Sequence, residues 1–380
     1  KYGMPEGGRE GSLVIASFNI RKLSTYKGRK AELEFMARFC AACDLVSIQE
    51  VQDNLDGLRF LKERTESRVA GQGEYSFTTS DITGKAPGGK GMAERLAFLY
   101  RHHRIRRLDM TSDLTFDRSA VFNRLFDDEK IWAEAREAFA KKMARFKAGD
   151  LKTKPSFTPP EFLTFVRTPY VTAFEAPAAN DQPSLTFTSV AAHLVYGKPV
   201  ERKQEFEALF DWLANRLTAK DRLVTPNFIL MGDLNLNFDD PKADRKPIDK
   251  LIKAGNADIF GDPDAQRIYF PFIDKHPDFK KVFTTNARAN QTFDQIAFFL
   301  GAEEKRLPNH TWHGDIKKRG PDDFDYGVFD FAELFAQALL GKSYLRLNKT
   351  EKKKLGKKFE HSVSDHLPIW VRLPRPGFAP

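Results

Sequence analysis

The sequence predicts an α/β protein in which helices cover the faces of β-sheets. Short apolar, β-branched runs alternate along the chain with amphipathic segments of helical period. The chain has 380 residues, of which 41% are hydrophobic and 30% charged, so it is long enough to enclose a sizeable core. Strands interspersed with helices are typical of proteins whose sheets bury their faces against helices. We therefore expect the helices to form outer layers around the strands.

Eight segments are predicted as strands, because each is a short run of apolar and β-branched residues. They are Leu13–Asn19, Leu45–Glu50, Leu96–Tyr100, Tyr170–Glu175, Leu185–Leu194, Phe228–Asn235, Phe293–Leu300 and Leu367–Leu373. No apolar run approaches the length of about 18 residues that a membrane-spanning helix needs. The sequence therefore predicts no transmembrane segment.

Two further segments have the apolar periodicity of helices that pack on a sheet. The first runs from Arg29 to Cys43 and the second from Glu201 to Leu217. The two cysteines of the chain, Cys40 and Cys43, lie on the apolar side of the first helix as a C-x-x-C. That spacing also occurs in redox centres and zinc sites. Since no second Cys or His pair lies nearby in the sequence, we interpret both thiols as core residues.

The alternation of strands and helices is interrupted twice, and we interpret both interruptions as insertions in one domain that covers residues 1–380. The first, at about 122–162, contains a basic helix from Asp127 to about Lys147. Prolines follow that helix, as expected of a loop that returns to the domain. The second insertion is expected at about 303–361.

The second insertion contains a predicted helix that begins at Asp330. Glu333 stands three residues further on, which indicates a capping box, and Gly341 stands where a helix would end. Six lysines then fall within the ten residues Lys349–Lys358. Such a run favours a solvated face, and it leaves a phosphate-contacting role open.

The overall charge favours polyanionic partners. Lys and Arg number 61 against 52 Asp and Glu, which leaves a net charge of +9 and a pI near 9.3. A positive surplus attracts nucleic acid through long-range steering and counterion release, although many basic proteins bind none. The composition leaves the compartment of the protein open. Nothing in the sequence indicates oligomerisation, and we expect a monomer.

Polar and charged residues gather at the ends of the predicted strands, where α/β sheets form a crevice. They are Asn19, Gln49, Glu50, His193, Asp233, Asn235, Asp294, Asp365 and His366. Oxygen ligands with few thiols suit a hard cation such as Mg²⁺, Mn²⁺ or Ca²⁺. Histidines beside such a site serve as proton-transfer groups or as positive charge against a phosphate. The sequence therefore predicts a divalent-metal site accompanied by two histidines.

The motifs that contain these residues resemble, in order, the signatures of the endonuclease/exonuclease/phosphatase superfamily. They are SFNIR at 17–21, QE at 49–50, ERLAFLYR at 94–101, RTP at 167–169, the histidine at 193, GDLNL at 232–236, FDQI at 293–296 and SDHLP at 364–368. Together they span nearly the whole chain. The resemblance implies a four-layer α/β sandwich, with two packed mixed β-sheets flanked by helices as in deoxyribonuclease I. It places the active site at one edge, where loops of both sheets meet.

The resemblance also implies roles for the residues around the metal. Glu50 would be the principal metal ligand, and Asn19 and Asp365 would complete or support the site. Asp233 would orient or deprotonate the attacking water. Asn235 would hold the scissile phosphate or a second metal.

The matched histidines would act on the phosphate. His193 and His366 would donate hydrogen bonds to its oxygens or protonate the leaving group. Glu94 matches the acidic partner of His193, and Asp294 that of His366, so each carboxylate would orient its imidazole and raise the imidazole pKa. Arg167 matches an arginine that contacts phosphate or supports the framework of the site.

Three motifs are typical of the deoxyribonuclease I branch, namely FNIR, the glutamate before LAFLYR, and FDQI. Arg21 matches an arginine that this branch uses near the DNA minor groove. Two positions depart from the branch, since Met92 stands in place of a sugar-contacting tyrosine and Gln52 in place of an arginine that enters the minor groove. The protein must therefore hold its substrate differently. The basic helix of the first insertion and the lysine run are candidate contacts.

The implied activity is hydrolysis of a phosphodiester by metal-activated water with a histidine general acid. Mg²⁺ is the expected metal and nucleic acid the expected substrate, with DNA favoured and RNA left open. The alternatives are a phospholipid phosphodiesterase of the sphingomyelinase type or an inositol-type phosphatase. Bacterial sphingomyelinases tend to carry an exposed aromatic hairpin. Phe270, Phe272 and Phe279 are aromatic here, but Pro271 and Pro277 interrupt any regular hairpin. A non-catalytic nucleic-acid-binding protein on this fold is the alternative of another class, and the presence of Glu50 and His366 argues against it.

Overall fold

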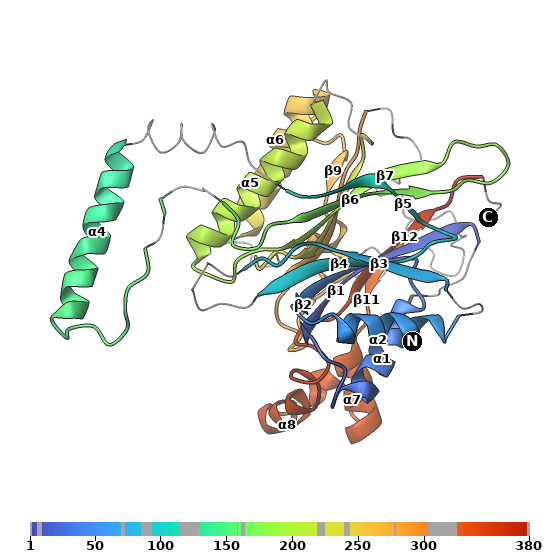
Figure 1. Ribbon diagram of the computed structural model, residues 1–380, viewed down its shortest axis with the longest axis horizontal. Coiled ribbons are helices and arrows are strands. Elements are labelled where there is room, and N and C mark those ends of the chain that lie inside the picture. The colour runs from blue at the N-terminus through green and yellow to red at the C-terminus, as the bar shows by residue number, and fades with distance from the viewer. Residues whose placement is uncertain are drawn as a thin grey trace.

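Two mixed six-stranded sheets pack against each other, and helices cover their outer faces (Figure 1). The computed structural model describes residues 2–5, 10–69, 73–84, 93–114, 129–157, 159–160, 164–218, 225–238, 244–276, 279–302, 304 and 325–377. The predicted four-layer α/β sandwich is thereby confirmed. Among the described residues, no helix combines the length and the apolar character needed to cross a membrane.

The first sheet has the strand order β11-β12-β1-β2-β4-β3. Its strands are β1 (Ser12–Leu23), β2 (Leu45–Gln52), β3 (Tyr75–Thr79), β4 (Glu94–Arg101), β11 (Asp325–Val328) and β12 (Ile369–Pro374). Only β1 and β2 run parallel, and the other described neighbours are antiparallel. The first nine residues of β1 are all buried, as expected of a central strand with both faces covered.

The second sheet has the strand order β5-β6-β7-β8-β10-β9. Its strands are β5 (Arg106–Asp113), β6 (Tyr170–Ala176), β7 (Leu185–His193), β8 (Phe228–Asp233), β9 (Ile268–Tyr269) and β10 (Asp294–Phe299). Here β7 and β8 form the parallel pair. The fully buried strands β8 and β10 are antiparallel neighbours, so the end of β8 and the start of β10 lie at the same edge of the sheet. This edge carries the polar residues discussed below.

Helices cover each sheet on its outer side (Figure 1). On the first sheet they are α1 (Lys30–Cys40), α2 (Asp56–Glu66), α7 (Phe331–Leu340) and α8 (Lys349–Phe359), and on the second they are α5 (Pro199–Thr218) and α6 (Arg245–Phe260). Two short 3-10 helices, η1 (Pro271–Ile273) and η3 (Tyr344–Arg346), lie in connections. In α8 the lysines Lys353, Lys354, Lys357 and Lys358 are exposed opposite buried Leu355 and Phe359. The expected solvated face is thus confirmed.

The ends of α7 show one correction to the predicted capping. Asp330 accepts a hydrogen bond from the backbone N–H of Glu333 at 2.8 Å, and Gly341 ends the helix with a φ of 62°. The reciprocal half of the capping box was predicted wrongly. The carboxylate of Glu333 accepts from the N–H of Tyr344 at 2.6 Å, while the N–H of Asp330 donates to the carbonyl of Tyr2. Glu333 therefore anchors the following turn rather than its own helix start.

The C-x-x-C cysteines are free and fully buried, as predicted for core residues. Cys40 ends α1, and the thiol of Cys43 donates to the carbonyl oxygen of Phe39 at 3.4 Å. Burial raises the pKa of the Cys40 thiol to about 12. A thiol with so high a pKa is a poor nucleophile and a poor metal ligand, since both roles require the thiolate.

Candidate active site

Three neighbouring strands bring charged side chains together at one edge of the second sheet. His193 at the end of β7 pairs in register with Asp233 at the end of β8, and Asp294 at the start of β10 pairs with Asp233 from the other side. Gly232 precedes Asp233 with a φ of 150°, and a Cβ at that position would collide with the carbonyl oxygen of Ala192. The glycine of the GDLN motif therefore allows the close strand approach that positions Asp233.

His366 lies between two buried carboxylates. Its Nδ1 is 2.9 Å from Oδ2 of Asp294, and its Nε2 is 3.4 Å from Oδ2 of Asp233. The hydroxyl of Thr285 donates to the same Asp294 oxygen at 2.7 Å and holds that carboxylate in place. Burial would lower the pKa of His366, but the two carboxylates outweigh it and raise the pKa well above its ordinary value. The cationic form of His366 is therefore favoured, with a hydrogen bond between Nδ1 and Asp294 and an ion pair between Nε2 and Asp233.

His193 has a different environment. Its Nδ1 is 3.3 Å from Oε1 of Glu94, and its Nε2 is 3.5 Å from Oδ2 of Asp233. The guanidinium of Arg167 forms an ion pair with the same Glu94 oxygen and also lies 3.2 Å from Nε2 of His193. Burial and the charge of Arg167 lower the pKa of His193 to about 4. Glu94 was expected to raise this pKa, whereas burial and the charge of Arg167 hold the pKa of His193 below its ordinary value.

Asp233 connects the two sheets. Its Oδ2 accepts a hydrogen bond from the side-chain amide of Asn19 on β1 at 3.1 Å, and its Oδ1 accepts from the backbone N–H of Asn235 at 3.0 Å. Burial would raise the pKa of Asp233, but His366 and His193 reverse this effect and lower it. Asp233 is therefore an ionised carboxylate at the junction of both sheets.

The three expected metal ligands lie at the adjoining end of the first sheet. Asn19 is fully buried, Glu50 is partly buried, and the side chain of Asp365 is 42% exposed. Glu50 accepts from the backbone N–H of Lys22 at 3.1 Å, and Asp365 forms an ion pair with Arg21 at 3.3 Å. Among the described residues, no hydrogen bond joins the three to one another.

Both carboxylates nevertheless act on the histidine pair. The negative charge of Glu50 opposes the lowering of the His193 pKa, and that of Asp365 contributes to the raised pKa of His366. These interactions place Glu50 and Asp365 within electrostatic reach of the two rings. The residues that were predicted from separate motifs thus converge on one region.

One oxygen in this region suits a cation. The side-chain oxygen of Asn19 is buried and has no hydrogen-bond donor among the described residues, which is costly for a buried acceptor. Asp233, Asp294 and His366 also bring ligand atoms within 4.8 Å of one another. In that cluster, however, both ring nitrogens of His366 already face the carboxylates of Asp294 and Asp233. The open oxygen of Asn19, together with the hard oxygens of Glu50 and Asp365, fits a divalent cation better.

The remaining predicted residues border this centre. Asn235 adopts a φ of 53° and donates from its side-chain amide to the carbonyl of Leu194 at 2.8 Å. Arg21 donates to Asp365 at 3.3 Å and to the carbonyl of Glu360 at 3.2 Å, so it contacts the expected metal site. Gln52 pairs with Glu94 between β2 and β4. Met92 lies outside the described residues.

Sequence inspection missed a buried carboxylate that supports the site from α5. The two oxygens of Glu205 accept hydrogen bonds from the backbone N–H groups of Val166 and Val195, each at 2.7 Å. These valines flank the segments that carry Arg167 and His193. The sequence did contain one indication that Glu205 is buried. It lies four residues before Leu209, so it falls on the apolar side of the helix.

Two hydroxyls were also missed. Ser364 donates to the carbonyl of Asn19 at 2.6 Å and accepts from the N–H of His366 at 3.0 Å. Thr285 holds Asp294 as described above. Isolated serines and threonines carry no sequence signal for such roles, because they are equally common in ordinary turns.

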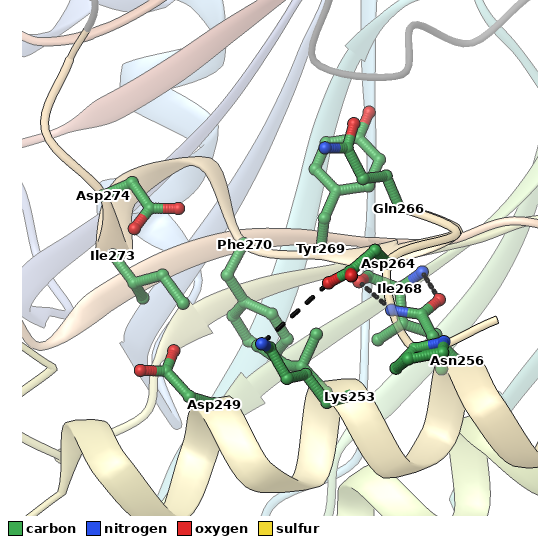
Figure 2. Close-up of a pocket in the computed structure, with 12 residues that line it drawn as sticks. Asp249, Lys253, Asn256, Asp264, Gln266, Ile268, Tyr269, Phe270, Ile273 and Asp274 are labelled. Atoms are coloured by element: carbon green, nitrogen blue, oxygen red, sulfur yellow. Dashed lines mark hydrogen bonds and ion pairs between the residues drawn. The ribbon is translucent and has the colours of Figure 1, made fainter.

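A separate hollow lies away from these residues. A cavity of about 230 Å³ opens between α6 and the segment 263–274 (Figure 2). Its polar groups are largely paired with one another. Lys253 lies 3.9 Å from Asp264, and Asn256 exchanges hydrogen bonds with the backbone of Ile268. Since no strand-end residue of the candidate site lines it, the cavity takes no part in the site.

The fold and the site together define a class of α/β sandwich proteins whose polar centre lies where the edges of two packed sheets meet. The chain belongs to the endonuclease/exonuclease/phosphatase family, whose sequence model matches residues 16–291. Members of this family are hydrolases that act on phosphoester bonds.

Two curated relatives are named deoxyribonuclease-1-like 1. The protein of Sus scrofa is 32% identical over 104 residues, which cover 27% of this chain and 31% of the relative. The protein of Homo sapiens is 24% identical over 238 residues, which cover 62% of this chain and 59% of the relative. The matches thus span less than two thirds of the length of either relative.

Solved structures of similar fold include ANGEL2, described as a 2',3'-cyclic phosphatase, and the TDP2 protein of D. rerio in complex with a single-strand DNA product. ANGEL2 has a TM-score of 0.48 and 13% identity, covering 98% of this chain and 97% of its own. TDP2 has a TM-score of 0.46 and 13% identity, covering 95% of this chain and 98% of its own.

Proposed function

We propose that the protein is a divalent-metal-dependent phosphodiesterase that cleaves DNA. The observation that carries this proposal is the placement of Asp233 between His193 and His366, at the point where Asn19 joins the sheets. Each histidine has a second carboxylate on its other nitrogen, so both rings have fixed orientations. Such an arrangement suits proton transfer around a phosphate at a fixed position.

In the proposed reaction, the protein positions water on one side of phosphorus and an acid on the other. Asp233 accepts a hydrogen bond from the water and takes its proton as the oxygen attacks phosphorus. His366, oriented by Asp294, donates a proton to the leaving oxygen when its bond to phosphorus breaks. Arg167 and His193 border the phosphate oxygens. A divalent cation held by Glu50, Asn19 and Asp365 would stabilise the negative charge that builds on the phosphate.

Three observations favour DNA over the alternative substrates. The net charge of +9 suits a polyanion, and both named relatives are deoxyribonuclease-like. The lipid alternative would benefit from an exposed aromatic hairpin. Instead Phe270 and Phe272 are buried on either side of Pro271. Phe279 is 56% exposed, but it is a single residue whose ring lies against His276 and Phe283, and it forms no aromatic hairpin with the buried pair.

The test is nicking of supercoiled plasmid DNA with Mg²⁺ or Mn²⁺, repeated in EDTA. His366→Ala is expected to reduce the rate by about 10²-fold or more, the usual contribution of a general acid. His361→Ala is the matched control, because the same change is made at an exposed position five residues away. The control should nick at the wild-type rate.

The other outcomes separate the alternatives. An intact plasmid, together with metal-dependent hydrolysis of bis-nitrophenyl phosphate, would keep the catalytic mechanism and refute DNA as the substrate. An absence of both activities, with retained binding of DNA, would support the non-catalytic alternative. Equal losses in His366→Ala and His361→Ala would argue against the proposed acid.

A further inference from the structure

Residues 129–157 form an arm that stands apart from both sheets (Figure 1). It consists of α4 (Glu129–Lys147) and the loop that follows, and we call it the basic arm. The ring of Phe157 in the loop lies 6.4 Å from that of Trp132 and 5.5 Å from that of Phe139. Trp132 is the one buried residue of the helix. The loop therefore covers the side of α4 that carries Trp132 and part of Phe139, while Met143 and Phe146 are half-buried and Ile131 is exposed.

The exposed sides of the basic arm are strongly positive. The arm contains eight Lys and Arg residues against four Asp and Glu. Its distal part, residues 139–154, has six exposed basic residues against the single acidic residue Asp150, and they are Lys141, Lys142, Arg145, Lys147, Lys152 and Lys154. Such a density exceeds what solubility requires, and it favours a polyanion as the ligand.

The basic arm is rooted beside the candidate active site. The segment that returns from the arm leads through Arg167 to β6, which begins next to the end of β7 where His193 stands. Gln204 at the first turns of α5 donates to the carbonyl of Pro160 at 2.6 Å and so fastens the return segment. A ligand that lies over the site can therefore continue along the arm.

We propose that the basic arm is a second DNA-binding element, which holds the phosphate backbone of the duplex on one side of the cleaved bond. This inference rests on the proposed function, because it assumes the same DNA substrate. A helix of 19 residues is about 28 Å long. That length corresponds to about 8 base pairs at about 3.4 Å each. The contact depends on phosphate charge and reads no sequence.

The test compares two double variants with the same change in net charge. Lys142→Glu/Arg145→Glu alters the distal arm. Arg106→Glu/Arg107→Glu alters two exposed residues of the edge strand β5, at the end of the second sheet that lies away from His193. Affinity is measured by fluorescence anisotropy with a labelled duplex of roughly 30 base pairs, in EDTA, over a series of salt concentrations. Hydrolysis of bis-nitrophenyl phosphate with Mg²⁺ is measured in parallel.

The arm variant is expected to bind the duplex about tenfold more weakly at physiological salt. The slope of log K against log salt concentration should become shallower by about 2, because each of the two lost phosphate contacts contributes about 0.9. The control variant should change affinity less than about twofold, because its charges lie far from the bound DNA. Hydrolysis of the small substrate should be unchanged in both.

Equal weakening in the two variants would overturn the inference, since net charge alone would then explain the effect. Failure of the wild-type protein to bind the duplex would overturn it as well. Failure of the proposed function gives a different result. If the proposed function is wrong, the wild-type protein leaves plasmid intact in Mg²⁺, whatever affinities the two variants have for the duplex. If the wild-type protein nicks plasmid but the two variants bind the duplex with identical affinity, the DNA-binding role of the basic arm is refuted and the proposed function stands.

Discussion

Glu205 provides a direct test of how the site is held together. This carboxylate on α5 is only 4% exposed, and it accepts the backbone N–H groups of Val166 and Val195. Val166 directly precedes Arg167, and Val195 follows His193 by two residues. One buried side chain therefore fixes two segments that deliver charged groups to the site. Glu205→Gln preserves its volume and changes its hydrogen bonding.

The size of the effect follows from the two contacts, each of 2.7 Å. Glutamine keeps one acceptor oxygen and places an NH₂ group against the other backbone N–H. The variant thus loses one charge-assisted hydrogen bond to a partly buried backbone N–H, which costs about 1.5–3 kcal/mol of the free energy of unfolding. A displacement of Arg167 or His193 of about 1 Å would lower kcat/KM by about 10²-fold.

The assays are denaturant unfolding and metal-dependent hydrolysis of plasmid and of bis-nitrophenyl phosphate. Glu207→Gln is the matched control on the same helix. Its ion pair with Lys203 spans 3.5 Å between side chains that are 38% and 53% exposed, and such a pair contributes less than about 1 kcal/mol. If Glu205→Gln matches Glu207→Gln in both stability and kcat/KM, Glu205 does not position the site.

Three further predictions follow from the same contacts. Asp294→Asn should lower kcat/KM by about 10- to 100-fold with the fold retained by circular dichroism, because His366 loses the charge that orients it; unchanged kcat/KM would contradict this. EDTA should abolish hydrolysis, and added Mg²⁺ should restore it. Binding of Mg²⁺, measured by calorimetry, should be lost in Glu50→Gln but retained in the control Glu63→Gln, whose carboxylate lies on α2. Burial raises the pKa of Cys40 from 9.0 to about 12, so the unfolded thiol ionises first and stability is lost as the pH rises through this window. Above about pH 9, the wild-type protein should therefore lose up to about 1.4 kcal/mol more of its free energy of unfolding per pH unit than Cys40→Ala does, as measured by denaturant unfolding at a series of pH values.

Much of the fold was predictable because the central strands are continuous apolar runs. β1, β7 and β8 were found from their composition, and α5 from its period. β5 was missed because it is an edge strand with alternating exposed charges. β11 has only four residues, and it joins the first sheet through pairing with the distant β12. Such pairing depends on tertiary context that a local pattern does not contain.

For the candidate site, the sequence predicted which polar residues end the strands but not their electrostatic states. His193 and His366 occur in similar settings in the sequence, yet the shifts of their pKa values are opposite. The difference arises because the Arg167 guanidinium lies against both His193 and its partner Glu94, whereas His366 lies between the carboxylates of Asp294 and Asp233. Both effects depend on burial and on partners from distant segments.

The central position of β12 in the first sheet has a consequence for synthesis of the chain. β1 leaves the ribosome well before its neighbour β12 and before Ser364, whose hydroxyl bonds Asn19 and which lies 345 residues further along the chain. The nascent chain therefore carries Asn19, Glu50 and Asp233 long before His366 joins them. Since domains complete their folding only when all central strands are available, the site stays unassembled until synthesis has passed residue 374.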